Sequence, residues 1–330
     1  MANNNVINIE KLKLQKPRVS LSCPEPLRMW LAAFAAFIAI MQSAFTDSFR
    51  SLGLALLAAA AALLTEFCFL YRNGKTAMLK DGSAVASALV FTLLLPNQIS
   101  PVYAVLGIVF SIAVIKHCFG GLGSNWLNPA AGGWLFVRLA WPDSFNLALK
   151  VPADFAAQAG FFETNLRPVL NNTVFAFFKT ELPSGYLDFL TSTRPGIIAD
   201  RGVLALLLGS ILIIAFRAGR TWVPVIWLAV FLFLTRLAGN AAVWSGDIFL
   251  TLCSGGTLAV AFLLAMDPVT NGKSIICAAV AAAAGGFLAW LFRFPGGELY
   301  GAVISVLAIN ALLPAFRTIE NYLLYERRTS

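Results

Sequence analysis

Charged side chains are scarce in this chain of 330 residues. Asp, Glu, Lys and Arg together make up 12% of it, whereas soluble proteins carry about 25%. Apolar residues make up 59%, and the mean hydropathy is +0.78. These values exclude an ordinary soluble protein and indicate a polytopic membrane protein.

Histidine and cysteine are too few, and too scattered, for a metal centre built by this chain alone. The single histidine, His117, follows Lys116 at an expected helix end, where we expect a solvated cap rather than a metal ligand. The cysteines form no CxxC pair, which argues against a zinc or iron–sulfur site and favours a packing role. They are Cys23, Cys68, Cys118, Cys253 and Cys277.

The sequence also lacks a secretory signal and a dinucleotide-binding fingerprint. Its start, "MANNNVINIEKLKLQKPRVSLSCPEP", has no apolar core, so we expect no cleaved signal peptide. Without a glycine-rich nucleotide motif, no soluble NAD-binding domain is expected. What remains is a series of apolar segments, near Leu27–Phe45, Ser51–Leu70, Ser83–Leu95, Val102–Ile115, Pro129–Trp141, Val203–Phe216, Trp222–Leu237, Thr251–Met266, Ser274–Phe292 and Tyr300–Leu313.

The basic residues predict how these ten segments cross the membrane. With the N-terminus inside, fifteen Lys and Arg residues fall in inner loops, and only Arg50, Arg138, Arg236 and Arg293 fall in short outer ones. This asymmetry follows the positive-inside rule, and it places both termini in the cytoplasm. Topology thus accounts for the net charge of +8, and no nucleic-acid partner is expected.

The chain divides into two halves of five segments. We expect a cytoplasmic segment 1–26, a first half 27–142, an external segment 143–202, a second half 203–314 and a cytoplasmic tail 315–330. The third segment of each half, "KDGSAVASALVFTLLLP" and "CSGGTLAVAFLLAMDP", starts with small polar residues, runs short and ends at proline. Such a pair predicts two inverted repeats with broken third helices. The alternative is that two glycine-rich helices are similar in composition only.

Two acidic residues within or next to these segments are candidates for function. Glu66, in "LLTEFCFL", lies inside a predicted span, where an acid marks a functional site by default. The alternatives are that it reaches the interface or pairs with Arg72. Asp267 ends the second broken helix, and there we favour a solvated turn former over a carboxylate on an ion path.

Three stretches together resemble one family. They are "KDGSAVASALVFTLLLP", "GGLGSNWLNPAAGGWLF" and "LCSGGTLAVAFLLAMDPVTNGK". They resemble the membrane-embedded D subunit of Rnf-type ion-translocating ferredoxin:NAD oxidoreductases, with the B subunit of sodium-translocating NADH:quinone oxidoreductases a close second. The resemblance implies a ten-helix, urea-channel-like fold and electron transfer through flavins, coupled to movement of Na⁺ or H⁺. It also implies other membrane and peripheral subunits as partners, because this chain cannot complete the reaction alone.

The resemblance implies a covalent FMN on a threonine of the external segment, attached by a flavin transferase. Thr173, in "LNNTVFAFFKTEL", fits by its place before Lys179–Thr180. Thr257, in "SGGT", matches the residue types of the family's attachment pattern, but it lies at an expected helix start within the membrane. Residues 170–172, Leu-Asn-Asn, replace the family's Ser-Gly-Ala step, so an unmodified Thr173 is the alternative.

The resemblance further implies a second flavin, riboflavin or FMN, bound without a covalent bond near "GSNWLNPA". Asn125 and Asn128 would hydrogen-bond its polar edge, and Trp126 would pack against its ring. Asn128 with Pro129 is also expected to cap helix five, and both roles are compatible. Two other functions remain open on the same fold: a channel for a small neutral solute and a scaffold without flavin.

Overall fold

The computed structural model describes residues 24–46, 49–121, 125–146, 161–177, 181, 187, 196–239, 244, 246–267 and 274–329. Within these ranges the chain is helical apart from turns, and the one β-type contact is an isolated bridge between Pro96 and Ile197. The predicted all-α class is confirmed. Residues 1–23 and the Lys179–Thr180 pair lie outside the described residues.

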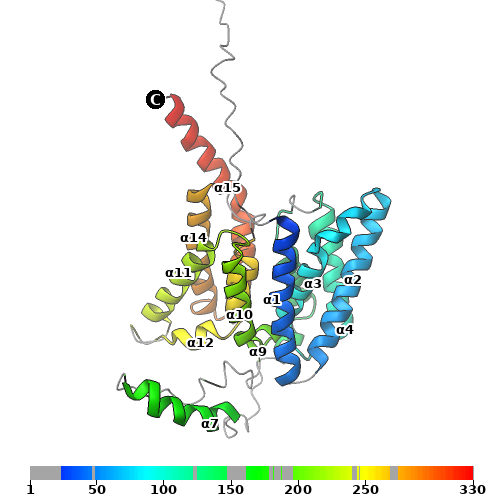
Figure 1. Ribbon diagram of the computed structural model, residues 1–330. Coiled ribbons are helices and arrows are strands. Elements are labelled where there is room, and N and C mark those ends of the chain that lie inside the picture. The colour runs from blue at the N-terminus through cyan, green and yellow to red at the C-terminus, as the bar shows by residue number, and fades with distance from the viewer. Residues whose placement is uncertain are drawn as a thin grey trace, which may run out of the picture.

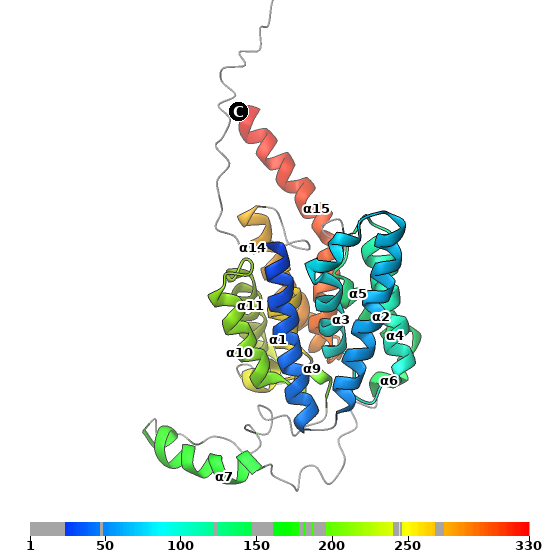
Figure 2. The same ribbon diagram turned by 45° about the vertical axis from the view of Figure 1, so that its right-hand side comes forward.

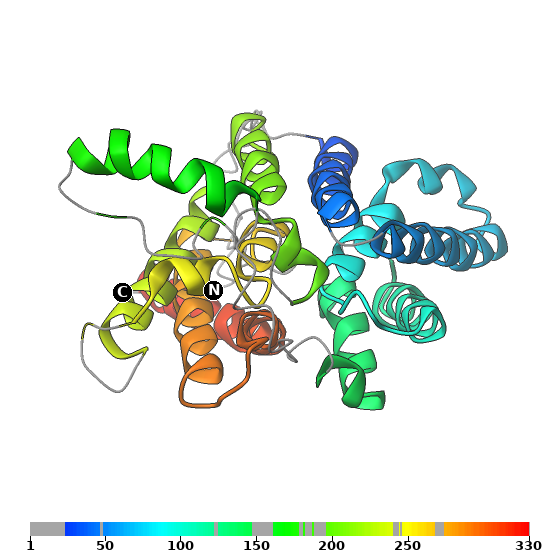
Figure 3. The ribbon, with the colours of Figure 1, turned by 90° about the horizontal axis from the view of Figure 1, so that it is seen from below.

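The first half of the chain forms a bundle on one side of the molecule (Figures 1 and 3). Its helices are α1 (Glu25–Thr46), α2 (Arg50–Arg72), the short 3-10 turn η2 (Thr76–Asp81), α3 (Ser83–Leu93), α4 (Pro101–Phe110), its π-helical continuation η3 (Ser111–His117) and α5 (Pro129–Ala140). Between the halves lie α6 (Asp143–Asn146), α7 (Phe161–Leu170) and the π-helical turn η6 (Asn171–Phe175). Helix α7 extends away from the bundle at its lower end (Figures 1 and 2).

The second half follows the same order of long and short helices. It consists of α9 (Ile198–Arg201), α10 (Val203–Ala215), α11 (Trp222–Ala238), α12 (Ile248–Leu252), α13 (Thr257–Ala259), its π-helical continuation η7 (Val260–Leu264), α14 (Ile275–Arg293) and α15 (Gly301–Thr329). Each of the ten predicted apolar segments is mainly helical here, and the eighth is interrupted between Leu252 and Thr257. Helix α15 continues to Thr329, so the predicted boundary at 314/315 falls inside a helix.

The described helices fit a membrane protein in length and in surface. Helices α1, α2 and α14 are long and apolar enough to cross a membrane, and α3, α4 with η3, α10, α11 and the first part of α15 are shorter apolar helices. Large apolar side chains point outward from them, among them Leu56, Ile211 and Ile276, which are 61%, 60% and 73% exposed. Such surfaces require lipid or a partner protein to cover them.

Small residues bring the helices of the two halves into close contact. A Cβ added to Gly209 of α10 would lie 2.7 Å from the Cβ of Ala35 in α1, and one on Gly202 would lie 2.6 Å from the carbonyl oxygen of Ala39. Backbones approach this closely only where side chains are minimal, as in packed membrane helices. The contact joins α1 of the first half to α10 of the second.

Two short helices, α3 and α13 with η7, are both hydrogen-bonded to α9. At the lower end of the bundle, the backbone amide of Ile198 in α9 donates to the carbonyl oxygen of Leu95, just after α3, at 3.0 Å. The carboxylate of Asp200, also in α9, accepts from the amide of Gly256, just before α13, at 2.7 Å. Helix α9 therefore joins the end of α3 to the start of α13, and we call α3 and α13–η7 the half-helices.

Candidate functional site

A pocket lies between the half-helices, at the start of α3 and the end of η7. We call it the central pocket. It holds about 740 Å³ of empty space when the open solvent at its mouth is counted. Its lining comes from α1, α3, η3, α5, the end of α10 and η7. The lining residues are Arg28, Met29, Ala32, Ser83, Ala86, Ser87, Val90, Lys116, Asn125, Asn128, Pro129, Ala130, Ile213, Ala218, Phe262, Leu263, Leu264, Met266 and Asp267.

Both asparagines that the sequence singled out line this pocket. The side chain of Asn128 caps α5, because its Oδ1 accepts from the amides of Ala130 at 3.0 Å and Ala131 at 3.3 Å. Its Nδ2 donates to Asp267 Oδ2 at 3.1 Å. The predicted cap is therefore confirmed. The Oδ1 of Asn125 is buried and has no hydrogen-bond partner among the described residues, so Asn125 is the freer of the two for a ligand.

The structure does not bring the other candidate site residues to the pocket. Trp126 is 49% exposed, is absent from the pocket lining and faces Phe119, with 6.4 Å between the ring centroids. Thr173 lies on η6, outside the bundle, where its exposed hydroxyl donates to the carbonyl oxygen of Val169 at 2.7 Å. Thr257 is 1% exposed, and its hydroxyl donates to the carbonyl oxygens of Thr251 and Ser254. A modifying enzyme would reach Thr173 and not Thr257.

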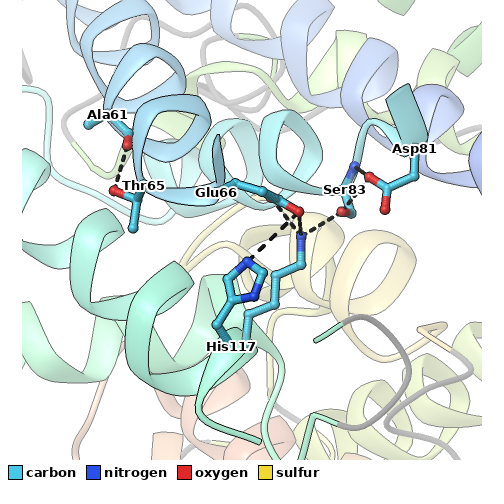
Figure 4. Close-up of polar contacts among 7 residues, drawn as sticks. Ala61, Thr65, Glu66, Asp81, Ser83 and His117 are labelled. Atoms are coloured by element: carbon cyan, nitrogen blue, oxygen red, sulfur yellow. Dashed lines mark hydrogen bonds and ion pairs between the residues drawn. The ribbon is translucent and has the colours of Figure 1, made fainter. Parts of the chain in front are cut away.

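A buried ion pair lies at the wall of the pocket (Figure 4). The Nζ of Lys116, on η3, donates to both carboxylate oxygens of Glu66, on α2, at 2.6 and 2.7 Å. It also donates to Ser83 Oγ at 2.6 Å, and Ser83 in turn donates to Asp81 Oδ1 at 2.6 Å. Lys116 and Glu66 are each 2% exposed. The pair links α2, η3 and the first residue of α3.

This ion pair corrects three expectations. Glu66 pairs with Lys116 and not with Arg72, since residues six apart on α2 do not share a helix face. Lys116 is buried in a helix, so it does not belong with the loop residues counted for topology. His117 is not a solvated cap: its ring stacks on Phe69 with 4.8 Å between centroids and lies 4.0 Å from Glu66. An acid inside one span and a lysine at the end of another were the only sequence signal of this pair.

The start of the second half-helix is filled by the protein's own side chains. The carboxylate of Asp200 accepts a hydrogen bond from the amide of Gly256. The guanidinium of Arg293 donates to the carbonyl oxygen of Ser254 at 3.0 Å and to Thr257 Oγ1 at 3.3 Å. A half-helix start offers amide donors and the positive end of the helix dipole. In the structure a carboxylate from outside the ten predicted segments takes that place.

Burial raises the pKa of the Asp200 carboxyl to about 6, although the amide of Gly256 and the charge of Arg293 both act to lower it. Asp200 stands in α9, before the first predicted span of the second half. Its proton is thus held more tightly in the folded protein than in an unfolded chain. This site therefore responds to pH near neutrality.

The lining of the central pocket combines apolar walls with a few polar side chains. The walls come from α1, α3 and η7, and the polar side chains include Asn125, Lys116 and Asp267. Asp267 is half-buried and bonded to Asn128, so it is neither a fully solvated turn former nor an isolated carboxylate. Binding sites between the helices of a bundle have this combination of apolar walls and a few polar groups.

The described part of the chain is helical, with several apolar helices and a pocket between two short ones, and these features define a helical membrane protein. The chain belongs to the NQR2, RnfD, RnfE family, whose sequence model matches residues 20–324. The family resemblance found in the sequence is confirmed.

Several relatives match over most of their length. The chain is 28% identical to the D subunit of the "Proton-translocating ferredoxin:NAD(+) oxidoreductase complex" of Clostridium ljungdahlii, over 87% of both chains. It is 30% identical to the D subunit of the "Na(+)-translocating ferredoxin:NAD(+) oxidoreductase complex" of Acetobacterium woodii, over 73% of this chain and 71% of the relative. It is 29% identical to the D subunit of the "Ion-translocating oxidoreductase complex" of Yersinia pseudotuberculosis, over 87% and 90%.

Proposed function

We propose that this chain is the flavin-carrying membrane subunit of an ion-translocating ferredoxin:NAD oxidoreductase complex. The observation that carries the proposal is the central pocket, with apolar walls and a buried Asn125 oxygen that lacks a partner among the described residues. The printed names of the relatives supply the reaction. Since one name specifies protons and the other Na⁺, the proposal covers both ions. The partners are the other membrane and peripheral subunits of the complex.

The residues of the pocket fit the ring system of a flavin, bound as riboflavin or FMN. The carboxamide of Asn125 offers both a donor and an acceptor to a polar ring edge, and the walls from α3 and η7 cover an apolar face. A bound flavin would supply one- and two-electron transfer. The chain's own part is to hold the ring in place, exclude water from it and set the charge around it.

Changing Asn125 tests this site directly. Asn125→Leu is expected to release non-covalent flavin, because a lost hydrogen bond to a buried polar group weakens binding by about 1–3 kcal/mol. Trp126→Leu, next to it but outside the pocket lining, is the matched control and should retain flavin. The measurement is the flavin extracted from purified complex per chain. Full retention in Asn125→Leu would remove the proposed site.

A second FMN is proposed as a phosphoester on Thr173, attached by a flavin transferase. The exposed hydroxyl of Thr173, on a helical turn outside the bundle, supports this assignment. The intact chain should then carry the mass of FMN minus water and fluoresce in denaturing gels. Thr173→Val should remove both signals, and Thr257→Val, at a buried hydroxyl, should leave them unchanged. A native chain without the added mass would refute the covalent site.

We further propose ten membrane spans in two inverted repeats, with the termini in the cytoplasm and the protein in the bacterial inner membrane. The proposal is supported by the helical state of all ten apolar segments and by the way α9 joins the end of α3 to the start of α13. A reporter fused after Ser330 should read cytoplasmic, and one inserted near Gly160 should read external. The opposite reading at either site would overturn this topology.

A further inference from the structure

Lys116 contributes the one lysine ammonium among the residues that line the central pocket. Its side chain is 2% exposed, and its partner Glu66, equally buried, is not among the lining residues. Lys116 is therefore the member of this ion pair that lines the pocket.

Three hydrogen bonds fix the position of this charge. Both oxygens of Glu66 and the hydroxyl of Ser83 accept from Nζ at 2.6 to 2.7 Å. An ammonium has three N–H groups, so all of them are used. Ser83 is itself held, because Asp81 Oδ1 accepts from both its amide, at 2.8 Å, and its hydroxyl. A lysine side chain that is normally mobile is thus held in one place.

Stability alone is a weak reason for such an arrangement. Burying two charges costs several kcal/mol of solvation, and replacing a buried pair with apolar residues is often neutral or stabilising. The field of the pair, in contrast, acts strongly on its surroundings, since charges interact far more in a protein interior than in water. The group that would feel this field lies in the pocket.

The other charged groups that line the pocket have partners of their own. Arg28 Nη2 lies 2.7 Å from Glu25 Oε1, which is half exposed to solvent and screened by it. Asp267 accepts a hydrogen bond from the neutral carboxamide of Asn128. Among the residues that the structure describes, Lys116 is the pocket-lining cation that is paired with a buried carboxylate.

We propose that Lys116 sets the reduction potential of the flavin in the central pocket, with Glu66 and Ser83 as positioning residues that hold the ammonium at the wall. This inference rests on the proposed function. Reduction adds negative charge to a flavin, and a fixed positive charge nearby favours the reduced form. The carboxylate of Glu66, which does not line the pocket, opposes this effect.

The test is the midpoint potential of the non-covalent flavin in purified complex, followed by its absorbance. Lys116→Met should lower the potential, because the positive charge is lost. Glu66→Gln should raise it, because glutamine still accepts from Lys116 but no longer opposes its charge. The double variant Glu66→Gln with Lys116→Met should fall between the two. Lys80→Met, an exposed lysine outside the pocket, is the control and should leave the potential unchanged.

The signs of these shifts distinguish the inference from a structural role. If the ion pair only joins helices, the variants lose stability or flavin content without opposite shifts in potential. Equal potentials in wild type, Glu66→Gln and the double variant, all with bound flavin, would overturn the inference and leave the flavin site intact. Wild-type complex without any non-covalent flavin would instead refute the proposed function, and the inference with it. If Lys116→Met does not fold, Glu66→Gln still decides the sign.

Discussion

The two half-helices begin in the same way and differ in what their first turn faces. Gly82 precedes Ser83 with φ of 74°, and Gly256 precedes Thr257 with φ of 68°. In each case a cation donates to the hydroxyl of the first residue: Lys116 to Ser83, and Arg293 to Thr257. Each cation stands at or near the end of the helix that follows the half-helix, which is α4 with η3 for Lys116 and α14 for Arg293.

The surroundings of the two cations are different. Lys116 is compensated by a carboxylate and lies at the wall of the pocket. Arg293 directs its guanidinium to backbone carbonyl oxygens, and Asp200 covers the helix amide beside it. One start thus borders the central pocket, and the other is covered by side chains of the protein itself.

The largest expected effect is the loss of closure at the second start. Arg293→Met should lower the free energy of unfolding by about 3–5 kcal/mol, because it leaves the carbonyl oxygen and hydroxyl of Ser254 and the hydroxyl of Thr257 without their donor, at about 1–3 kcal/mol each. Thermal unfolding in detergent measures it. The control Arg138→Met removes a half-exposed pair with Glu298 and should cost about 1 kcal/mol or less. Equal losses in both variants would contradict the closed state of this start.

The next effect depends on pH and belongs to the second start. The folded pKa of Asp200, about 6, lies above the value of 3.8 for a free aspartate. A raised pKa favours the folded state fully below pH 4, and this stability is lost as pH rises through 6, by about 3 kcal/mol in total. Thermal unfolding of wild type and Asp200→Asn between pH 4 and 7.5 should show this slope in wild type only. A parallel slope in Asp200→Asn would refute the assignment.

The glycines before each start give the third comparison. Gly82→Ala and Gly256→Ala place a side chain in left-handed backbone, which costs about 1–2 kcal/mol. They also bring the new Cβ to 2.7 Å from the Trp30 ring and 3.0 Å from Ile197 Cδ1. Gly74 has a φ of 66° with open space around it, so Gly74→Ala brings the backbone strain without a steric clash. We expect both central variants to lose more stability than Gly74→Ala, as measured by thermal unfolding.

The smallest expected effect concerns the link between the pocket and α5. Asn128→Ala removes a helix cap and the bond to Asp267, and should cost about 1 kcal/mol. Asn128→Asp keeps an oxygen for the cap and places it beside another carboxylate. If capping is the main contribution, Asn128→Asp should be closer to wild type at low pH than Asn128→Ala. Identical losses at all pH values would contradict this.

The sequence was informative where the signal is local. The Asn128–Pro129 step predicted the cap of α5, and the small residues before Ser83 and Thr257 predicted where the half-helices begin. Helix α12 was not expected as a separate turn, because its five residues continue the apolar run of the next segment. The pattern of apolar residues alone does not show where a helix is interrupted within such a run.

The polar contacts at the centre were missed because they join distant parts of the chain. Glu66 and Lys116 are 50 residues apart, and Asp200 and Gly256 are 56 apart. Glu66 was a candidate because it lies inside a predicted span, but its partner Lys116 was not expected, and Asp200 was not singled out at all. The flavin assignments for Asn125 and Thr173 came from the family resemblance, and no local pattern in these residues specifies a flavin.

The position of α9 has a consequence for the order in which the protein is completed during synthesis. Leu95 is synthesised before Ile198, whose amide donates to its carbonyl oxygen, and Asp200 is synthesised before Gly256, whose amide donates to its carboxylate. In a ribosome-bound chain that extends only to α5, the hydrogen bond at the end of α3 is therefore not yet formed. The first half should stay sensitive to proteases at Leu95–Ile99 until α9, and then α13, have left the ribosome. Folding of the first half is thus completed only when the second half assembles.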